Sequence, residues 1–327
     1  MKSLIPIVAV LAVLAAVPLI IHSNVTLNFL VTALMIALAG QGWNILGGYG
    51  GQYSFGHAAF FGTGAYVTAI LQVRYGLNAW VAFVAGIAGG AALGGALGAL
   101  TFRSGLRGSY FALVTLAFAE VFRILASVAP ITGAGVGTLI KLDLGIRTLQ
   151  FQSRAAFYWA VLVLVGISLI AAQLIERSRF GMWLIAVREN EDAAKALGVN
   201  VNRVKLAAMV VSAGITAAAG CFYAQYFLFI DSGIAYGSWI SIQALVTPII
   251  GGVGTVFGPL LGALVVKSLG EAAKLMAGDA PGLDLIIYGA ILILVIWFTP
   301  RGLIGGLARM HAVLLRRGLS AEGMRRG

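Results

Sequence analysis

The chain has 327 residues, of which 60% are hydrophobic and 10% are charged, and its formal net charge is +11. Because a soluble domain of this size carries about a quarter charged residues, the composition excludes an ordinary soluble protein. Long apolar runs with so few charges predict an all-α polytopic membrane protein.

Ten apolar stretches predict transmembrane helices, since a helix needs roughly 20 mostly apolar residues to cross the hydrocarbon layer. Six precede a charged interval at 176–205 and four follow it. The weakest are the third, which follows a glycine-rich turn, and the eighth, which is short. Residues 1–299 should form one transmembrane domain, and 300–327 a basic cytoplasmic tail. The expected spans are 4–21, 26–46, 55–72, 79–101, 109–129, 155–175, 206–229, 237–250, 256–275 and 283–299.

The basic residues sort by side once these spans are assigned. If the charged interval is cytoplasmic, 15 of the 22 lysines and arginines lie inside and 6 lie outside, with Arg123 within a span. Basic residues concentrate in the cytoplasmic loops of membrane proteins, so this arrangement places both termini in the cytoplasm. The positive charge is thus explained by a lipid bilayer and calls for no nucleic acid.

Two glycine-rich stretches interrupt the apolar pattern. Glycines in "LGGYGGQYSFG", 46–56, permit a broken or tightly turned backbone of the kind that lines cavities in membrane proteins. A second such turn is expected in "IIGGVGTVFGP", 249–259, because Pro259 suits the first turn of a new helix.

The span 79–101 carries Gly86, Gly90 and Gly94 at four-residue spacing. Small residues on one stripe of a helix let neighbouring backbones approach closely in lipid. We therefore expect tight helix packing along this stripe and no chemistry.

Polar side chains at membrane depth are the candidates for a translocation path, because ionisable groups are costly there. Glu120 and Arg123 stand three residues apart on one helix face and can pair. Either a path role or mutual neutralisation for packing explains that pair, and His57 could equally be a hydrogen-bonded packing residue. The candidates are Asn44, Gln52, Ser54, His57, Glu120 and Arg123.

The charged interval contains "RENEDAAKALGVN", which has the marks of a short, self-capped helix at 191–197. Asn190 is a favourable N-cap, the acidic Glu191 and Asp192 follow in the first turn, and Gly198 suits a left-handed stop. Upstream, "ERSRFGMWLIAVR" should form an amphipathic piece that places Phe180, Trp183 and Leu184 at the membrane interface.

A pre-capped helix with small side chains is suited to docking in a groove on a partner protein. The alternative is a solvated loop that links two spans. Ordinary connections are only a few residues long, and loops of this length are usually functional. From the residues alone, both interpretations remain open.

Other classes of site receive little support. The single Cys221 excludes an intrachain disulfide, and three histidines without a Cys/His cluster argue against a metal site. No G-x-x-x-x-G-K-[ST] phosphate loop occurs in the chain. We expect a protein that is not an enzyme and that binds no cofactor itself.

Four stretches resemble the LivM-type permeases of branched-chain amino acid ABC importers. They are "SRFGMWLIAVRENEDAAKALGVNVNRVKL" (178–206), "LGGYGGQYSFGHAAFFGTGAYVTAIL" (46–71), "LRGSYFALVTLAFAEVFRIL" (106–125) and "LVTPIIGGVGTVFGPLLGALVV" (245–266). Two departures stand out. The family's "TGGSDGL"-like turn reads "ITGAGVGTL" here, without its acidic residue, and Met182-Trp183 replace the usual basic residue.

The resemblance implies a type II ABC importer permease in a bacterial-type inner membrane. It implies a second, LivH-like permease subunit, two cytoplasmic ATPases that use ATP and Mg²⁺, and a periplasmic or lipid-anchored solute-binding protein. The ATPases would dock on the short helix and drive transport. The residues that this implicates in coupling are Glu189, Asn190, Glu191, Asp192, Ala193, Ala194, Lys195, Ala196, Leu197 and Gly198.

Competing hypotheses concern the substrate and the energy source. A related permease for urea, short amides or other amino acids would share these features. An ion-coupled secondary transporter would need intramembrane carboxylates, and Glu120 is the only acidic residue deep in a span. A membrane-embedded enzyme would need a catalytic cluster, which the sequence does not offer.

Overall fold

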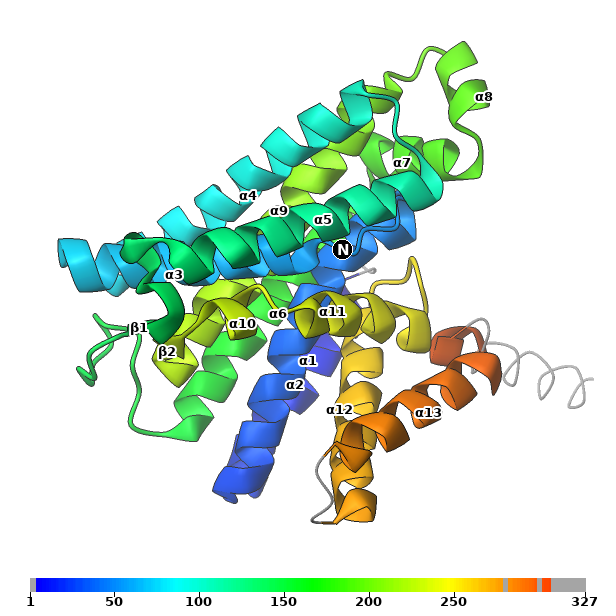
Figure 1. The fold of residues 1–327 in the computed structure, drawn as a ribbon. Coiled ribbons are helices and arrows are strands. Elements are labelled where there is room, and N and C mark those ends of the chain that lie inside the picture. Colours follow the sequence, from blue (N-terminus) through cyan, green and yellow to red (C-terminus); the bar gives the residue numbers. More distant parts are fainter. Residues whose placement is uncertain (1–3, 279–281, 299–301, 307–327) are drawn as a thin grey trace, which may run out of the picture.

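A computed structural model of the chain describes residues 4–278, 282–298 and 302–306 and is built almost entirely of helices (Figure 1). A helix lies in each of the ten expected stretches. The residues of the expected basic tail lie outside the described residues except for 302–306. The ten helices are α1 (Ile5–Ile20), α2 (Asn24–Trp43), α3 (His57–Tyr75), α4 (Ala79–Arg103), α5 (Gly108–Val128), α6 (Arg154–Arg177), α9 (Val201–Phe227), α11 (Ser238–Gly251), α12 (Gly258–Ala277) and α13 (Leu283–Phe298).

Six helical stretches in the described chain are long and apolar enough to cross a membrane. This agrees with an all-α polytopic membrane protein. The number of crossings and the side on which the termini lie stay predictions. The six stretches are Asn24–Tyr49, Ala79–Arg103, Gly108–Val128, Arg154–Arg177, Val201–Phe227 and Ser232–Gly251.

Shorter elements connect the long helices. The first glycine-rich stretch begins as a π-helix, η1, and then continues without helical structure to the start of α3. Two strands pair antiparallel, with Thr138 opposite Ile230. The short elements are η1 (Asn44–Tyr49), η2 (Pro130–Thr132), η3 (Ala134–Val136), β1 (Thr138–Leu139), α7 (Arg179–Glu189), α8 (Glu191–Ala196), β2 (Phe229–Ile230) and α10 (Ser232–Ala235).

The core of the molecule lies where α9 packs against α2, α3 and α4. The glycine stripe of α4 faces α9, as expected. A Cβ atom at Gly90 would lie 2.2 Å from the Cβ of Ala217, and one at Gly94 would lie 2.3 Å from the Cβ of Ala213. Such distances leave no room for any side chain, so the stripe sets how closely the two helices approach.

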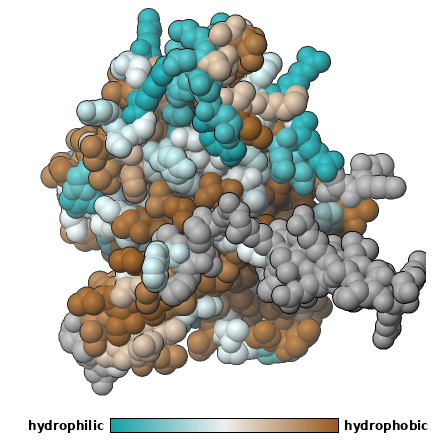
Figure 2. Space-filling view, turned by 90° about the vertical axis from the view of Figure 1, so that its right-hand side faces the viewer, coloured by the Kyte–Doolittle hydropathy of each residue, from teal (hydrophilic) through white to brown (hydrophobic). Residues whose placement is uncertain are grey.

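The connections gather at two opposite ends of the helix bundle (Figure 1). One end carries α7 and α8, and contacts described below join it to 44–56, Arg107 and the turn before α12. The other end carries β1 and β2, where Trp80 also donates a hydrogen bond from Nε1 to the carbonyl of Ile146 at 2.8 Å. Hydrophilic side chains gather at the α8 end, above a broad apolar surface (Figure 2).

Gly90→Ala should destabilise the protein, because the added Cβ meets a side-chain atom of Ala217 that the backbone holds in place. Overpacking of this kind costs about 1–3 kcal/mol of unfolding free energy. The measurement is the Tm of the detergent-solubilised protein, followed by tryptophan fluorescence. Gly95→Ala is the matched control, since its Cβ would lie 3.4 Å from Val210, an ordinary contact. Equal shifts in Tm for the two variants would contradict the packing role of the stripe.

Candidate coupling site and translocation-path residues

Helix α8 is capped at both ends by its own sequence. The side-chain oxygen of Asn190 accepts hydrogen bonds from the backbone N–H groups of Asp192 at 3.0 Å and Ala193 at 2.9 Å. Gly198 adopts φ +86°, the left-handed stop that the sequence predicts. The helix ends at Ala196, one residue earlier than expected. Its termini therefore leave few backbone groups that need a partner.

The two faces of α8 differ, and this corrects part of the sequence prediction. Ala194 is buried inside the chain, so it cannot contact a partner protein, although the sequence includes it in the docking segment. The outer face carries small side chains and Leu197, which is 85% exposed. The outward residues are Asp192, Ala193, Lys195, Ala196, Leu197 and Gly198.

The amphipathic helix α7 also lies differently from the prediction in one respect. Leu184, expected at the membrane interface, is fully buried and packs in the core, close to Gly50. Trp183, which was also expected at the interface, is exposed, and so is Met182. The buried leucine packs α7 against the first glycine-rich stretch. The charged interval is therefore held against the membrane domain and is not a flexible linker.

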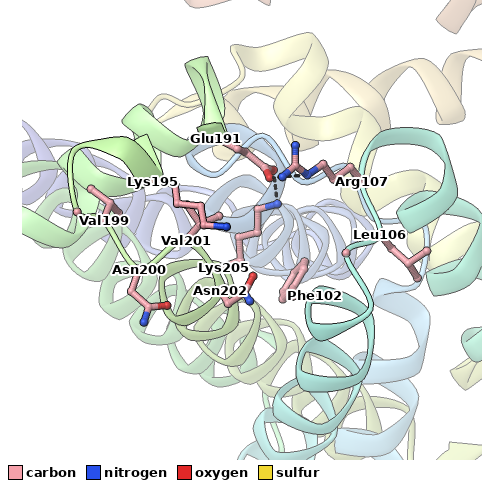
Figure 3. A pocket seen from close by; sticks show the side chains of 12 residues that line it. Phe102, Leu106, Arg107, Glu191, Lys195, Val199, Asn200, Val201, Asn202 and Lys205 are labelled. Carbon is pink, nitrogen blue, oxygen red and sulfur yellow. Dashed lines mark ion pairs between the residues drawn. The ribbon is translucent and has the colours of Figure 1, made fainter. Parts of the chain in front are cut away.

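Glu191 joins α8 to three other parts of the chain, and two of its partners, Arg107 and Lys205, are drawn in Figure 3. Its carboxylate forms an ion pair with Nε of Arg107 at 3.0 Å and accepts a hydrogen bond from Nε2 of Gln52 at 3.4 Å. It also pairs with the ammonium group of Lys205 on α9. The side chain of Lys205 is only 4% exposed and lies 5.6 Å from the ring centroid of Phe102. A buried charge must be paired, so these partners hold one another in place.

A cavity of about 370 Å³ opens at this cluster, lined by both charged and apolar side chains from the end of α4, the turn before α5, α8 and the start of α9 (Figure 3). Arg107 also donates to the exposed carboxylate of Asp192 at 3.3 Å. The hydrogen bond to Asp192 and the charge of Glu191 raise the pKa of Arg107. The turn between α4 and α5 is thereby tied to the first turn of α8.

Arg188, at the end of α7, reaches the first glycine-rich stretch. Its Nη1 donates to the carbonyl oxygen of Gly48 at 3.0 Å, and its side chain covers Gly51, where a Cβ would lie 2.5 Å from the Arg188 Cγ. Gly51 has φ +65°, so both its conformation and its surroundings require glycine. The charged interval thus rests directly on the broken backbone at 46–56.

Asn44 joins the two glycine-rich turns to each other. Its Nδ2 donates to the carbonyl of Thr255 at 2.9 Å, and its Oδ1 accepts from the N–H of Gly254 at 2.8 Å. The second turn is followed by α12, with Pro259 in the first turn, as the sequence predicts. With both sides of its amide in use, Asn44 has a structural role in this state of the protein.

The remaining path candidates at this end are also buried. Gln52 contacts Glu191 and so belongs with the coupling segment. The Ser54 hydroxyl accepts from the N–H of Gly56 at 3.1 Å. His57 begins α3 with its Nε2 2.9 Å from the hydroxyl oxygen of Ser212, and its Nδ1 has no hydrogen-bond partner among the described residues. These contacts favour packing roles for Ser54 and His57.

Glu120 and Arg123 lie apart from these four, on the outward face of α5. Arg123 donates from Nε to both carboxylate oxygens of Glu120, at 3.0 and 2.9 Å, and from Nη2 to one of them at 2.5 Å. The two side chains are 45% and 36% exposed. The predicted local pairing is present, but the pair is not packed within this chain. The six candidates therefore form two groups and not one site.

Three residues that join α7 and α8 to the rest of the chain were not predicted from the sequence. Arg107, Arg188 and Lys205 counted only as basic residues of the cytoplasmic side. Arg107 and Lys205 lie far from Glu191 along the chain on separate helices or turns, so no local spacing indicates that they meet. The one available signal was the presence of a lysine, Lys205, at the start of an apolar helix.

Comparison with known proteins identifies a family for nearly the whole chain. Residues 25–296 match the family described as branched-chain amino acid transport system / permease component. The high-affinity branched-chain amino acid permease protein LivM of Escherichia coli is 28% identical over 91% of this chain and 74% of its own length. Protein BraD of Pseudomonas aeruginosa, a permease of the same description, is 27% identical over 85% and 94%.

A more distant likeness covers part of the chain. The xylose transport system permease protein XylH of Haemophilus influenzae is 31% identical over 42% of this chain and 37% of its own length. No solved structure matches significantly.

Glu191→Gln should loosen the segment 179–205, because the charge of Lys205 then loses its partner within the protein. Removing one member of a largely buried pair costs several kcal/mol, about 3–5 in the fully buried case. Limited trypsin digestion, which reports local opening, should cleave the variant faster at Arg188, Lys195 or Arg203. Asp192→Asn is the control, because that exposed carboxylate contacts only Arg107. Equal cleavage rates for the two variants would contradict the central position of Glu191.

Proposed function

The chain belongs to the branched-chain amino acid transport permease family, and we propose that it is a multi-pass permease subunit that moves branched-chain amino acids across the inner membrane. The observation that carries this conclusion is the family match over 25–296. The match covers all or nearly all of each long helix except α1, which precedes it. Relatives named LivM, LivH and BraD are all permeases of branched-chain amino acid transport. Since LivM and LivH are two permeases, this subunit works together with a second one.

The outer face of α8 is the docking surface for a partner ATPase. Small alanine side chains lie near the exposed Leu197, and the capped ends of the helix leave few backbone groups that need a partner. A short helix of this kind fits a groove on another protein. The partner ATPases supply ATP and Mg²⁺ chemistry, because the sequence has no phosphate loop of its own.

Movement of α8 reaches the membrane helices through its inner face. Glu191 connects it to α9, to the turn before α5 and to Gln52, and Arg188 connects the adjoining α7 to Gly48. Both links end at the broken backbone of 46–56, and Asn44 extends them to the turn before α12. A displacement of α8 by a docked ATPase is thus transmitted to both glycine-rich turns.

The arrangement of the two ends supports ten crossings with the α8 end in the cytoplasm. The charged interval and both glycine-rich turns share that end, and the basic residues are most frequent there. The opposite end, with β1, β2 and the long connection between α5 and α6, then faces the solute-binding protein. Both termini are cytoplasmic in this arrangement.

The partial match to a xylose permease favours one second candidate, a permease with a different small solute. Its likeness covers less than half of this chain, whereas the amino acid permeases match over most of it. Substrate competition distinguishes the two.

The complete complex, purified from its native membranes and reconstituted in proteoliposomes with its solute-binding protein, should take up labelled leucine only when ATP is enclosed with the ATPases. Excess isoleucine or valine should compete with this uptake, while urea, acetamide or xylose should not. Uptake without ATP that follows an ion gradient would instead indicate a secondary transporter. Competition by xylose or urea alone would indicate the other substrate class.

Leu197→Glu should prevent the ATPase from co-purifying, because a carboxylate replaces the apolar side chain at the centre of the proposed docking face. The expected loss in association is at least about tenfold, since hot-spot residues at interfaces contribute about 2 kcal/mol or more. Leu142→Glu is the matched control, because Leu142 is an exposed leucine in the connection between α5 and α6 at the other end of the molecule. Normal co-purification of the Leu197→Glu protein would refute the docking surface without touching the substrate assignment.

A further inference from the structure

Helix α5 presents an ion pair on a face that the rest of this chain leaves open. The side chains of Glu120 and Arg123 bond only to each other among the described residues, and both are partly exposed. The buried stripe of α5 is narrow, and its open face is mostly apolar. The residues of the buried stripe are Phe111, Ala112, Thr115, Ala119 and Ala126, whereas Leu113, Leu116, Val121, Ile124 and Leu125 are exposed.

Lipid is a poor neighbour for this pair. Ionised groups within a span avoid the hydrocarbon and face other protein or a water-filled cavity. Glu120 lies in the interior of α5, about two turns before its end at Val128, and the shorter glutamate side chain cannot reach the membrane surface from there. Arg123 lies nearer that end but is held at this depth by its bonds to Glu120. Since this chain does not cover it, the second permease subunit and the aqueous path between the two subunits remain as its surroundings.

A pair used only for packing would look different. Mutual neutralisation inside a folded membrane domain is expected to bury both groups and to supply further hydrogen bonds for the carboxylate. The other polar candidates show this pattern, as Asn44 does with its bonds to Gly254 and Thr255. Glu120 and Arg123 share only one another and stay open to the outside of the chain.

We propose that Glu120 and Arg123 form a transient binding site for the zwitterionic head of the transported amino acid. The carboxylate of Glu120 accepts hydrogen bonds from the substrate ammonium group, and the guanidinium of Arg123 donates to the substrate carboxylate. An amino acid carries these two opposite charges on neighbouring atoms, as the pair does. This assignment rests on the proposed function, because it takes an amino acid as the substrate.

Binding of the substrate exchanges one ion pair for two and leaves the net charge unchanged. The internal ion pair opens while two equivalent ion pairs form with the substrate, so no net charge enters the path and no proton needs to move. An exposed ion pair contributes little net stability, so its opening costs little. The exposed aliphatic side chains on the same helix, Leu116 and Ile124 among them, offer apolar surface to a branched side chain. Such a site holds substrate weakly, which suits passage.

The first test measures leucine uptake by the complete, reconstituted complex carrying Glu120→Gln, Arg123→Gln or both. Each single variant should reduce uptake about tenfold or more, as expected for loss of a charge-assisted hydrogen bond. Co-purification with the ATPases, which dock at α8 in the proposed function, checks that each variant is folded and assembled. The double variant separates the two roles. If the pair only neutralises itself, removing both charges restores uptake, whereas loss of a substrate site leaves the double variant as impaired as the single ones.

Recovery of uptake in the double variant, or normal uptake in both single variants, would therefore overturn the site. Failure of the single variants to assemble, with assembly restored in the double variant, would also overturn it in favour of a contact between permeases. If the wild-type complex itself takes up no amino acid, the proposed function is wrong. Impaired assembly or restored uptake in the variants, by contrast, overturns only the proposed site.

A second test detects occupancy directly. A cysteine introduced by Ala117→Cys, one turn before Glu120 on the exposed surface of α5, should react with a small water-soluble thiol reagent. The native Cys221 is buried and gives a low background. Leucine should slow the reaction, whereas leucinamide and 4-methylpentanoate, which each lack one charge, should not. Val128→Cys, at the end of the helix, should react equally with and without leucine. Absence of labelling at position 117, or protection that survives Arg123→Gln, would contradict the proposal.

Discussion

Within a bilayer, every backbone polar group has to find its partner inside the protein, and this constraint governs where the chain can interrupt its helices. The chain interrupts its helices at 50–56 and at 252–257, and hydrogen bonds from other parts of the protein satisfy backbone groups at or next to both interruptions. Arg188 donates to Gly48, Asn44 bonds to Gly254 and Thr255, and the Trp43 indole donates to the carbonyl of Ser54 at 2.8 Å. The charged interval is thus part of what makes the broken backbone stable.

This dependence also explains why the coupling segment has two dissimilar faces. Its inner face provides Ala194, Leu184 and Glu191 to the membrane domain, where they are buried or paired. The side chains on its outer face are exposed and make few contacts with the rest of the described chain. A rigid connection on one side and a free surface on the other are the properties of an element that passes motion between two bodies. A flexible loop, which opens locally at little cost, would absorb such motion.

The features predicted correctly from the sequence are those with local causes. The N-cap at Asn190, the stop at Gly198, the new helix at Pro259 and the pairing of Glu120 with Arg123 each depend on residues within about one turn of one another. The positions of the long apolar helices follow from composition alone, whereas the number of membrane crossings stays a prediction. What could not be predicted depends on tertiary contacts.

The burial of Ala194 is such a case, because a short helix with three alanines has no clear apolar stripe, and its orientation depends on the helices it packs against. The meeting of Arg107, Lys205 and Gln52 at Glu191 joins segments far apart in the chain. For Glu120 and Arg123, the sequence indicates the pair but cannot tell whether another helix covers it.

The distribution of polar groups implies that this subunit has no complete path of its own. Asn44, Gln52, Ser54 and His57 are buried within the chain, and each has at least one hydrogen bond to another part of it. The ion pair on α5 is available, but only from outside the chain. In the proposed arrangement, a substrate that meets that pair passes along the surface of the subunit, where a second permease completes the wall. That proposal assigns substrate contact to the open face of α5 and motion to the glycine-rich turns next to α7 and α8, so the two properties reside in separate parts of the chain.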